Sequence, residues 1–278
     1  MRLRFTKMHG LGNDFMVVDA IHQQVEFSAE KIQQWSDRNF GIGFDQLLVV
    51  DSAQQAGVDF RYRIFNADGS EVQQCGNGAR CFARFVYDKG LTDKTEIQVE
   101  TASGVIVLYI EEGGLVRVNM GAPNFDPASL PFVQEKQRSK YVIEVLGDII
   151  SLGAVSMGNP HAVLLVDDVS EAPVEAFGSA IESSEFFPER VNVGFAEVVD
   201  ESHVRLRVYE RGAAETLACG TGACAAMAVL RSWALVNDSV TVTLPGGDLV
   251  ISWDGDVESP VWMSGPAVTV FEGEIEDE

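Results

Sequence analysis

Short segments rich in Val, Ile, Phe and Tyr recur along the chain, and several of them alternate apolar with polar positions. Alternation of this kind is typical of strands that bury one face. Glycine, asparagine and aspartate, which favour turns, separate the segments. The pattern predicts strands over residues 2–5, 15–19, 46–50, 60–65, 104–110, 115–120, 161–166, 203–209 and 239–244.

Amphipathic helices are fewer than strands. Ser28 is a suitable N-cap for a helix that presents Ile32 and Trp35 on one face and ends at Asn39. Residues 175–181 are predicted to form the corresponding helix of the second half.

Two further helical segments are much more apolar. Residues 79–87 form one, which stops before Gly90, and residues 223–235 form the other, which is apolar almost all round. A helix that is apolar on every side is a buried one. The sequence therefore predicts an α+β fold, in which each half is a curved, mostly antiparallel sheet wrapped around one central helix.

An internal repeat links these two buried helices. Cys75-Gly76-Asn77-Gly78 and Cys219-Gly220-Thr221-Gly222, 144 residues apart, each place a cysteine before a glycine-rich turn and an apolar helix. At the same spacing, Arg63-Ile64-Phe65-Asn66 aligns with Arg207-Val208-Tyr209-Glu210. Cysteines in matching positions of two half-chains suggest one thiol on each side of a shared cleft.

The repeat also predicts the domain organisation. A boundary near Met120-Gly121-Ala122-Pro123 separates the halves, which gives domains over residues 1–120 and 121–260. A chain of 278 residues is long enough for two domains of ordinary size.

Charge and hydropathy exclude some partners. Forty-two acidic against 20 basic residues give a net charge of −22, and nucleic acids and anionic membranes require a basic surface instead. No segment has the length of apolar sequence that a membrane span needs, and the N-terminus lacks the apolar stretch of a signal peptide. We expect a cytoplasmic protein that binds neither nucleic acid nor membrane.

The cysteines do not form a metal motif. There is no CxxC pair, and the four histidines are scattered, so we expect no zinc site and no other metal. Cys81 and Cys224 lie inside the apolar helices, where a cysteine is usually a small buried hydrophobe. Gly10-Leu11-Gly12 lacks the third glycine of a dinucleotide fingerprint, and we expect no cofactor.

Cys75 and Cys219 have a different setting. The backbone N–H groups and the macrodipole at a helix N-terminus lower a thiol pKa, and the same N–H groups bind carboxylates. A thiolate on one face of a carbon and a thiol on the other would transfer a proton across it without a cofactor. The repeat therefore indicates a racemase or epimerase that acts next to a carboxylate.

At these residues the chain resembles the diaminopimelate epimerase family from end to end. The motifs that carry the resemblance are FTKMHGLGNDF (5–15), GIGFDQ (41–46), FNADGS (65–70), QCGNGARC (74–81), GNPH (158–161), ERG (210–212) and ACGTGA (218–223). The resemblance implies that the substrate is 2,6-diaminopimelate, whose LL and meso forms are interconverted at one α-carbon in lysine and cell-wall precursor biosynthesis. It also implies a homodimer and a C-terminal strand, within residues 261–278, that returns to the first domain.

The same resemblance assigns roles to individual residues. Cys75 and Cys219 are the acid–base pair, and His161 and Glu210 lie near the thiols and tune their ionisation. Gly76, Asn77, Gly220 and Thr221 hold the reacting carboxylate. The residues expected to bind the substrate are Asn13, Gln46, Asn66, Gly76, Asn77, Asn159, Asn192, Glu210, Arg211, Gly220 and Thr221.

Two positions depart from the family pattern. The segment Gly212-Ala213-Ala214-Glu215 has alanine where the family usually carries a second glycine, so a position that needs φ > 0 would be strained. Phe271 stands where some relatives carry a tyrosine at the dimer contact.

Other functions remain open at this point. A proline or hydroxyproline racemase also uses two thiols, but the Glu210-Arg211 pair and Asn66 favour a substrate with a second zwitterionic end. An isomerase of the phenazine-biosynthesis type would typically lack the cysteine pair. A non-catalytic amino-acid binder or a redox-sensing dithiol protein is the alternative from a different class.

Overall fold

The computed structural model describes residues 2–72, 75–102 and 104–276. The chain forms two compact units: unit 1 comprises Met1–Val118 with Gly265–Glu278, and unit 2 comprises Asn119–Ser264.

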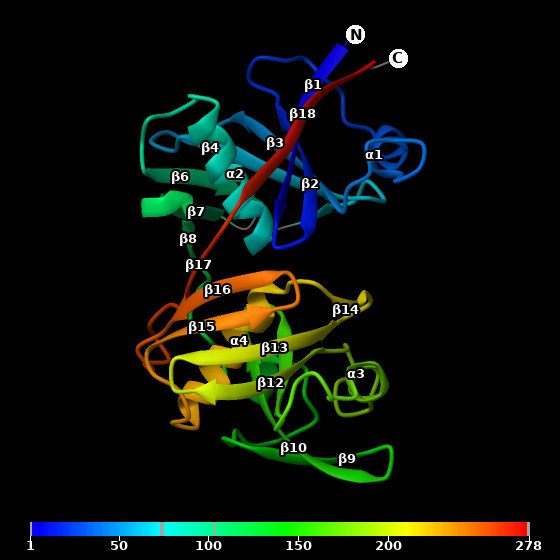
Figure 1. The fold of residues 1–278 in the computed structure, drawn as a ribbon, viewed down its shortest axis with the longest axis vertical. Coiled ribbons are helices and arrows are strands. Elements are labelled where there is room, and N and C mark those ends of the chain that lie inside the picture. The colour runs from blue at the N-terminus through cyan, green and yellow to red at the C-terminus, as the bar shows by residue number, and fades with distance from the viewer. Residues whose placement is uncertain (1, 73–74, 103, 277–278) are drawn as a thin grey trace. The chain divides into compact units, whose positions relative to one another are not determined.

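The C-terminal segment belongs to unit 1. Strand β18 (Val268–Glu276) pairs antiparallel with β1 (Arg2–Gly10), and Figure 1 shows these strands from the two ends of the chain running side by side. Residues 277 and 278 of the expected C-terminal strand lie outside the described residues.

In its described residues, unit 1 contains two α-helices, a short 3₁₀ segment and more strand than helix. Between β1 and β18, its elements are β2 (Asn13–Asp19), α1 (Ala29–Ser36), β3 (Gln46–Ser52), β4 (Phe60–Asn66), β5 (Glu71–Val72), α2 (Gly76–Asp88), β6 (Glu96–Thr101), β7 (Gly104–Ile110), η1 (Glu112–Gly114) and β8 (Val116–Asn119), whose last residue is assigned to unit 2.

Unit 2 has the same composition of elements. They are η2 (Pro127–Ser129), β9 (Tyr141–Val145), β10 (Asp148–Ser156), β11 (Pro160–Leu165), α3 (Val174–Glu182), β12 (Asn192–Asp200), β13 (His203–Glu210), β14 (Ala214–Thr216), α4 (Gly220–Ser232), β15 (Ser239–Leu244), β16 (Gly247–Ser252) and β17 (Trp262–Gly265), whose last residue is assigned to unit 1.

The strand pairings repeat between the units. In unit 1, β2 runs parallel to β3, β3 pairs antiparallel with β4, and β4 runs parallel to β6. In unit 2, β11 and β12 are parallel, β12 and β13 are antiparallel, and β13 and β15 are parallel. Each unit is thus a mixed sheet with few helices, and the predicted α+β fold of two similar halves is confirmed.

The central helices have matching ends. Cys75 and Cys219 are the N-cap residues of α2 and α4, and both helices have 13 residues. After α2, Gly90 has a left-handed φ of 65°, and the amide of Leu91 bonds to the carbonyl of Val86. At the position 144 residues later, Ala234 adopts a φ of 56° in the same kind of turn.

Two predicted helix C-termini are wrong. Helix α1 stops at Ser36 instead of Asn39, because the Asp37 carboxylate accepts the amides of Asn39 and Phe40 and bends the chain into a turn. Helix α4 stops at Ser232 rather than at residue 235, because Ala234 is left-handed.

Both central helices also start three residues earlier than predicted, within their glycine-rich turns. The glycines serve close packing there, since a side chain on Gly78 would collide with the Tyr62 hydroxyl. Packing of this kind outweighs the low helix propensity of glycine.

Each unit buries its sheet on more than one side. In unit 1, Leu47 and Val49 of β3 pack with Ile32 and Trp35 of α1, while α2 contacts β1, β2, β3 and β7. In unit 2, α3 contacts β12 and β13, and α4 contacts β10, β11, β12, β13 and β16. Strands covered on both faces read as continuous apolar runs, as β3 does.

Candidate active site

The first half-site is built around Cys75 at the N-terminus of α2. Cys75 has extended backbone angles (φ −144°, ψ 118°), and its half-buried sulfur accepts the Gly78 amide at an N···S distance of 3.4 Å. The thiol lies 3.8 Å from Asn13 Oδ1. A carbonyl oxygen only accepts, so the thiol form of Cys75 donates to Asn13, and the Gly78 amide stabilises the thiolate form.

Asn13 is held in place by its neighbours. Its Nδ2 donates to Asp45 Oδ2 at 2.9 Å, and its Oδ1 accepts from Asn77 Nδ2 at 3.3 Å. Asn13 follows the turn after β1, in which Leu11 (φ 56°) and Gly12 (φ 89°) are left-handed. This turn directs the start of β2 toward the N-terminus of α2.

A cluster of ion pairs fixes the same loops. Asp14 pairs with Lys7 at 2.6 Å and with Arg38 at 2.8 Å, and Arg38 also contacts Asp45 at 2.7 Å. Burial raises the pKa of Asp14, but the hydrogen bonds and charges of Arg38 and Lys7 outweigh it and lower the pKa to about 2. Lys7 Nζ also donates to the Gly43 carbonyl, so the cluster joins β1, β2 and the loop before β3.

Gln46 and Asn66 stand opposite each other at the start of β3 and the end of β4. Gln46 Nε2 donates to Asn66 Oδ1 at 3.0 Å, and Asn66 Nδ2 donates to Ser70 Oγ at 3.2 Å. Gln46 Oε1 is buried and has no hydrogen-bond partner among the residues that the structure describes. It is therefore an acceptor that a bound ligand could satisfy.

The second half-site is built around Cys219 at the N-terminus of α4, and its surroundings differ. Cys219 is only 4% exposed. Burial raises the pKa of its thiol well above the ordinary value, and the charge of Glu210 and a hydrogen bond to that carboxylate raise it further; the Thr221 hydroxyl and the Gly222 amide oppose this. Cys219 is therefore a thiol at neutral pH in this structure. Glu210 also accepts from Thr216 Oγ1 at 2.5 Å.

A short chain of hydrogen bonds leads from His161 to Cys219. Burial, and then the charge of Arg211, lowers the pKa of His161 to about 3, so the imidazole is neutral. Its Nε2 lies 3.0 Å from Asn159 Oδ1, and Asn159 Nδ2 donates to Thr221 Oγ1 at 3.3 Å. The Thr221 oxygen lies 3.6 Å from Cys219 Sγ. Because the Asn159 oxygen only accepts, the proton of His161 is on Nε2.

Asn192 and Arg211 are joined in unit 2. Asn192 is buried at the start of β12; its Nδ2 donates to the Pro160 carbonyl at 3.0 Å, and its Oδ1 accepts the Arg211 amide at 3.0 Å. The exposed Arg211 side chain donates to the Glu189 carbonyl at 3.3 Å. In this arrangement Asn192 positions the backbone of Arg211.

Sequence reasoning missed several residues that organise the half-sites. Arg80, in the first turns of α2, is fully buried and donates to Asn77 Oδ1 at 2.9 Å. Asp45 and Thr216 orient Asn13 and Glu210, respectively. Arg80 and Asp45 fall inside the family motifs, which was the available signal, whereas nothing in the sequence marked Thr216.

An ion pair repeats at the same spacing as the cysteines. The Arg63 guanidinium donates two hydrogen bonds of 2.9 and 3.1 Å to the Glu71 carboxylate. The Arg207 guanidinium donates two of 2.6 and 2.8 Å to the Glu215 carboxylate. Each pair ties the strand before the cysteine to the short strand that leads into it. The sequence repeat therefore has a shared structural basis.

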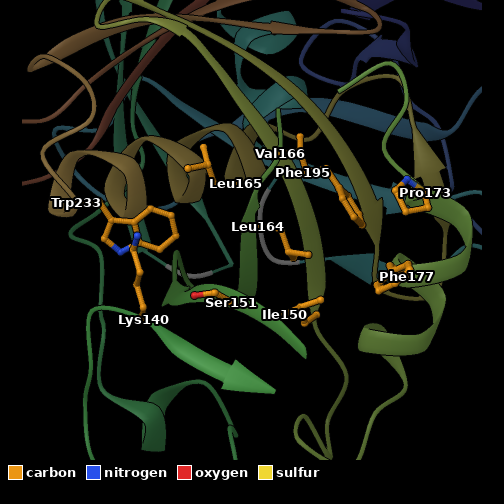
Figure 2. A pocket seen from close by; sticks show the side chains of 10 residues that line it. All are labelled: Lys140, Ile150, Ser151, Leu164, Leu165, Val166, Pro173, Phe177, Phe195 and Trp233. Atoms are coloured by element: carbon orange, nitrogen blue, oxygen red, sulfur yellow. The ribbon is translucent and has the colours of Figure 1, made fainter. Parts of the chain in front are cut away.

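A cavity of about 450 Å³ in unit 2 lies apart from these residues. Apolar side chains of β10, β11, β12 and α3 surround it, with Lys140 stacked on Trp233 at its edge (Figure 2). None of the candidate site residues lines it.

In the described part of the chain, no cluster of His, Cys, Asp and Glu could hold a metal ion. None of its helices is long and apolar enough to cross a membrane. Cys81 and Cys224 are fully buried, and burial raises the pKa of Cys81 to about 12, so the structural role expected for them is confirmed.

Comparison with known proteins gives one family. The family model of diaminopimelate epimerase matches residues 5–125 and 153–270. A diaminopimelate epimerase of Nitrosomonas europaea is 59% identical over 276 residues, which are 99% of this chain and 100% of the relative. One of Laribacter hongkongensis is 59% identical over 277 residues and 99% of both chains.

Solved structures with much lower identity share the fold. A PhzF-family phenazine biosynthesis protein of Bacillus anthracis has a TM-score of 0.69 at 18% identity and covers 100% of both chains. A hydroxyproline epimerase of Agrobacterium vitis has a TM-score of 0.69 at 16% identity and covers 99% of this chain and 92% of its own. At these identities the likeness extends to the fold alone.

Proposed function

Because the chain belongs to the diaminopimelate epimerase family, we propose that Cys75 and Cys219 are the acid and base of a two-thiol epimerisation. The enzyme interconverts LL- and meso-2,6-diaminopimelate, a step in lysine biosynthesis. The observation that supports the thiol pair is its repetition: in each unit a cysteine caps the central 13-residue helix.

The reaction needs one thiolate and one thiol on opposite faces of the α-carbon. The thiolate takes the α-proton, the electron pair of the C–H bond moves onto the carbon beside the carboxylate, and the other thiol delivers its proton to the opposite face. Cys219 beside Glu210 is set up as the thiol, and the Gly78 amide favours a thiolate at Cys75. After one turnover the two sulfurs have exchanged protonation states, so the reverse reaction uses them in exchanged roles.

Helix N-termini supply the groups that stabilise the developing charge. The first amides of an α-helix have no carbonyl partner within the helix, and their dipoles favour an anion. We assign Gly76 with Asn77 and Gly220 with Thr221 to the reacting carboxylate, since these residues open α2 and α4. Negative charge that spreads from the α-carbon onto this carboxylate is then met by fixed dipoles.

The other end of diaminopimelate carries an ammonium and a carboxylate. The exposed guanidinium of Arg211 suits the carboxylate, and the neighbouring Glu210 carboxylate suits the ammonium. Gln46 Oε1, which lacks a partner among the described residues, is a further acceptor for the substrate. Neutral amides complete the proposed substrate contacts without adding charge; they are Asn13, Asn66, Asn159 and Asn192.

The proposal extends to assembly and location. On β18, Phe271 is 47% exposed and packs edge-on against Phe5, and its neighbours Val268 and Val270 are exposed as well. We assign this face to a homodimer contact, in which the Phe271 ring replaces the tyrosine of some relatives. A biosynthetic enzyme of lysine and peptidoglycan precursors would work in the cytoplasm. If Phe271→Asp leaves a dimer intact in analytical ultracentrifugation, the contact lies elsewhere.

Proton NMR of the reduced protein with LL-diaminopimelate in D₂O tests the function. We expect loss of the α-proton signal and appearance of the meso form, both abolished in Cys75→Ala and in Cys219→Ala. Cys81→Ala and Cys224→Ala are the matched controls and should keep turnover, because these cysteines are buried in the helices. Full turnover by either Cys75→Ala or Cys219→Ala would refute the two-thiol mechanism, and the same assay with proline should show no exchange.

A further inference from the structure

A fully buried arginine lies beneath the first half-site. Arg80 is among the largest side chains with no exposed surface in the chain. Its Nε donates to the Pro266 carbonyl at 3.2 Å, and its Nη2 donates to Asn77 Oδ1 at 2.9 Å. A buried guanidinium is unfavourable unless its hydrogen bonds are satisfied. Its presence in this core therefore needs an explanation.

The bond from Arg80 fixes the orientation of two amides in turn. A guanidinium carries only donors, so the Asn77 atom that faces it must be the oxygen, and the Asn77 nitrogen must face Asn13. At the other end, the Asp45 carboxylate is an acceptor, so the Asn13 atom that faces it must be the nitrogen. Both constraints leave the Asn13 oxygen next to Cys75 Sγ.

The β1–β2 turn is held by the same side chain. A Cβ on Gly10 would stand 3.1 Å from Arg80 Nη2 and 3.3 Å from the Asn77 carbonyl. A side chain at Gly10 would require the Arg80 guanidinium or the Asn77 backbone to shift by a few tenths of an ångström, so glycine favours the close approach of this turn, which carries Asn13, to α2. Arg80 thus contacts both segments whose relative position sets the Cys75–Asn13 distance.

The second unit provides an internal comparison. The position 144 residues after Arg80 is Cys224, which is buried in α4 and uncharged. The repeated helix and its packing therefore do not require an arginine here. In unit 2 the hydrogen-bond chain that reaches Cys219 starts from the neutral His161 instead. Of the two repeated helices, only α2 carries a buried arginine at this position.

We propose that Arg80 is a positioning residue for Cys75: its guanidinium orients the Asn77 and Asn13 amides so that the Asn13 oxygen receives the Cys75 thiol. This role rests on the proposed function of Cys75 as an acid–base group. When the hydrogen bonds from Arg80 through Asn77 to Asn13 are intact, the protonated Cys75 sulfur has the Asn13 oxygen as its acceptor and the thiolate has the Gly78 amide as its donor. Both protonation states of Cys75 are then held in one geometry. Arg80 itself does not touch the substrate.

The test is a kinetic comparison of Arg80→Met with Arg80→Lys. Arg80→Met keeps the length of the side chain but donates nothing to Asn77, and it should lower kcat about 10- to 100-fold while KM changes less than about threefold, since a small misplacement of a reacting group costs about this much. Arg80→Lys restores a donor and should recover most of kcat. An unchanged kcat in a folded Arg80→Met protein would overturn the proposal.

A double-mutant cycle separates positioning from a general structural role. If Arg80 acts through Asn77, Arg80→Met in an Asn77→Ala background should lower kcat less than about twofold further. If the double variant loses kcat by the product of the two single losses, Arg80 does not act through Asn77 and the proposal is overturned. If Arg80→Met folds poorly, Arg80→Leu, which also donates nothing to Asn77, takes its place in the cycle.

A second readout does not depend on turnover. In a Cys219→Ala background the rate at which iodoacetamide alkylates Cys75 should change several-fold with Arg80→Met and return with Arg80→Lys. An unchanged alkylation rate would contradict the positioning role of Arg80. If Cys75→Ala proves active, the proposed function itself fails; if it is inactive and Arg80→Met is normal in both assays, only the role of Arg80 fails.

Discussion

Replacing Ala214 with glycine is expected to stabilise unit 2. Ala214 has a left-handed φ of 59°, in the segment where the family usually carries a second glycine, so the strain expected from the sequence is present. A left-handed conformation costs an L-residue about 1–2 kcal/mol relative to glycine. Glycine also lowers the free energy of unfolding by about 0.4–1 kcal/mol, because it gives the unfolded chain more conformational freedom. The net gain is about 0.5–1 kcal/mol.

The matched control is its neighbour, Ala213, which is exposed and does not have a positive φ. Ala213→Gly gains no relief of strain and should lose about 0.5–1 kcal/mol. The two variants differ by one position and have the same composition, so urea unfolding or the thermal midpoint compares them directly, with a separation of about 2–6 °C. If Ala214→Gly is no more stable than Ala213→Gly, the strain argument is wrong.

Three other changes follow from buried polar groups. Tyr62→Phe should raise the free energy of unfolding by about 1 kcal/mol, because the Tyr62 hydroxyl is buried without a hydrogen-bond partner in the described structure; urea denaturation measures this. Glu210→Gln should lower the pKa of Cys219, because the carboxylate charge is lost; the thiolate absorbance in a Cys75→Ala background reports it. His161 has a pKa near 3 when folded and about 6.5 when unfolded, so the unfolded chain binds the extra proton between these values and stability falls as pH falls. From pH 7 to pH 5 this loss is about 2 kcal/mol, and His161→Gln should abolish it.

The two helices capped by Cys75 and Cys219 could be located from the sequence because their signals are local. A cysteine, two glycines and an apolar run are read within a few residues, and the spacing of 144 residues places the second copy without ambiguity. Strands were harder to find when tertiary packing contradicted local preference. Gly153 lies in the middle of β10, which was missed, and side chains of Val229 and Trp233 occupy the space of its absent Cβ. Only the folded unit shows why glycine suits that strand.

The sequence analysis named individual candidate residues but not the hydrogen-bond network that joins them within each half-site. The order Arg80, Asn77, Asn13 and Asp45 joins positions that are distant in the chain, and a single sequence does not distinguish a buried arginine from an exposed one. The ionisation states of the Cys75 and Cys219 thiols also could not be predicted from the sequence. Both cysteines cap helices, which alone would lower both pKa values, yet burial and Glu210 reverse that expectation at Cys219.

The difference between the two half-sites agrees with the symmetry of the reaction. A racemase interconverts mirror images, whose free energies are equal, so its two bases gain nothing from unlike surroundings. LL- and meso-diaminopimelate are not mirror images, because the distant stereocentre stays fixed while the near one inverts. The two free-enzyme forms, with the proton on one sulfur or on the other, can then differ in energy without contradicting the chemistry. The Glu210 carboxylate raises the pKa of the Cys219 thiol and so favours the form in which Cys219 holds the proton. Repetition of the backbone thus provides two helix N-termini, and the side chains that are not repeated give the two cysteines different surroundings.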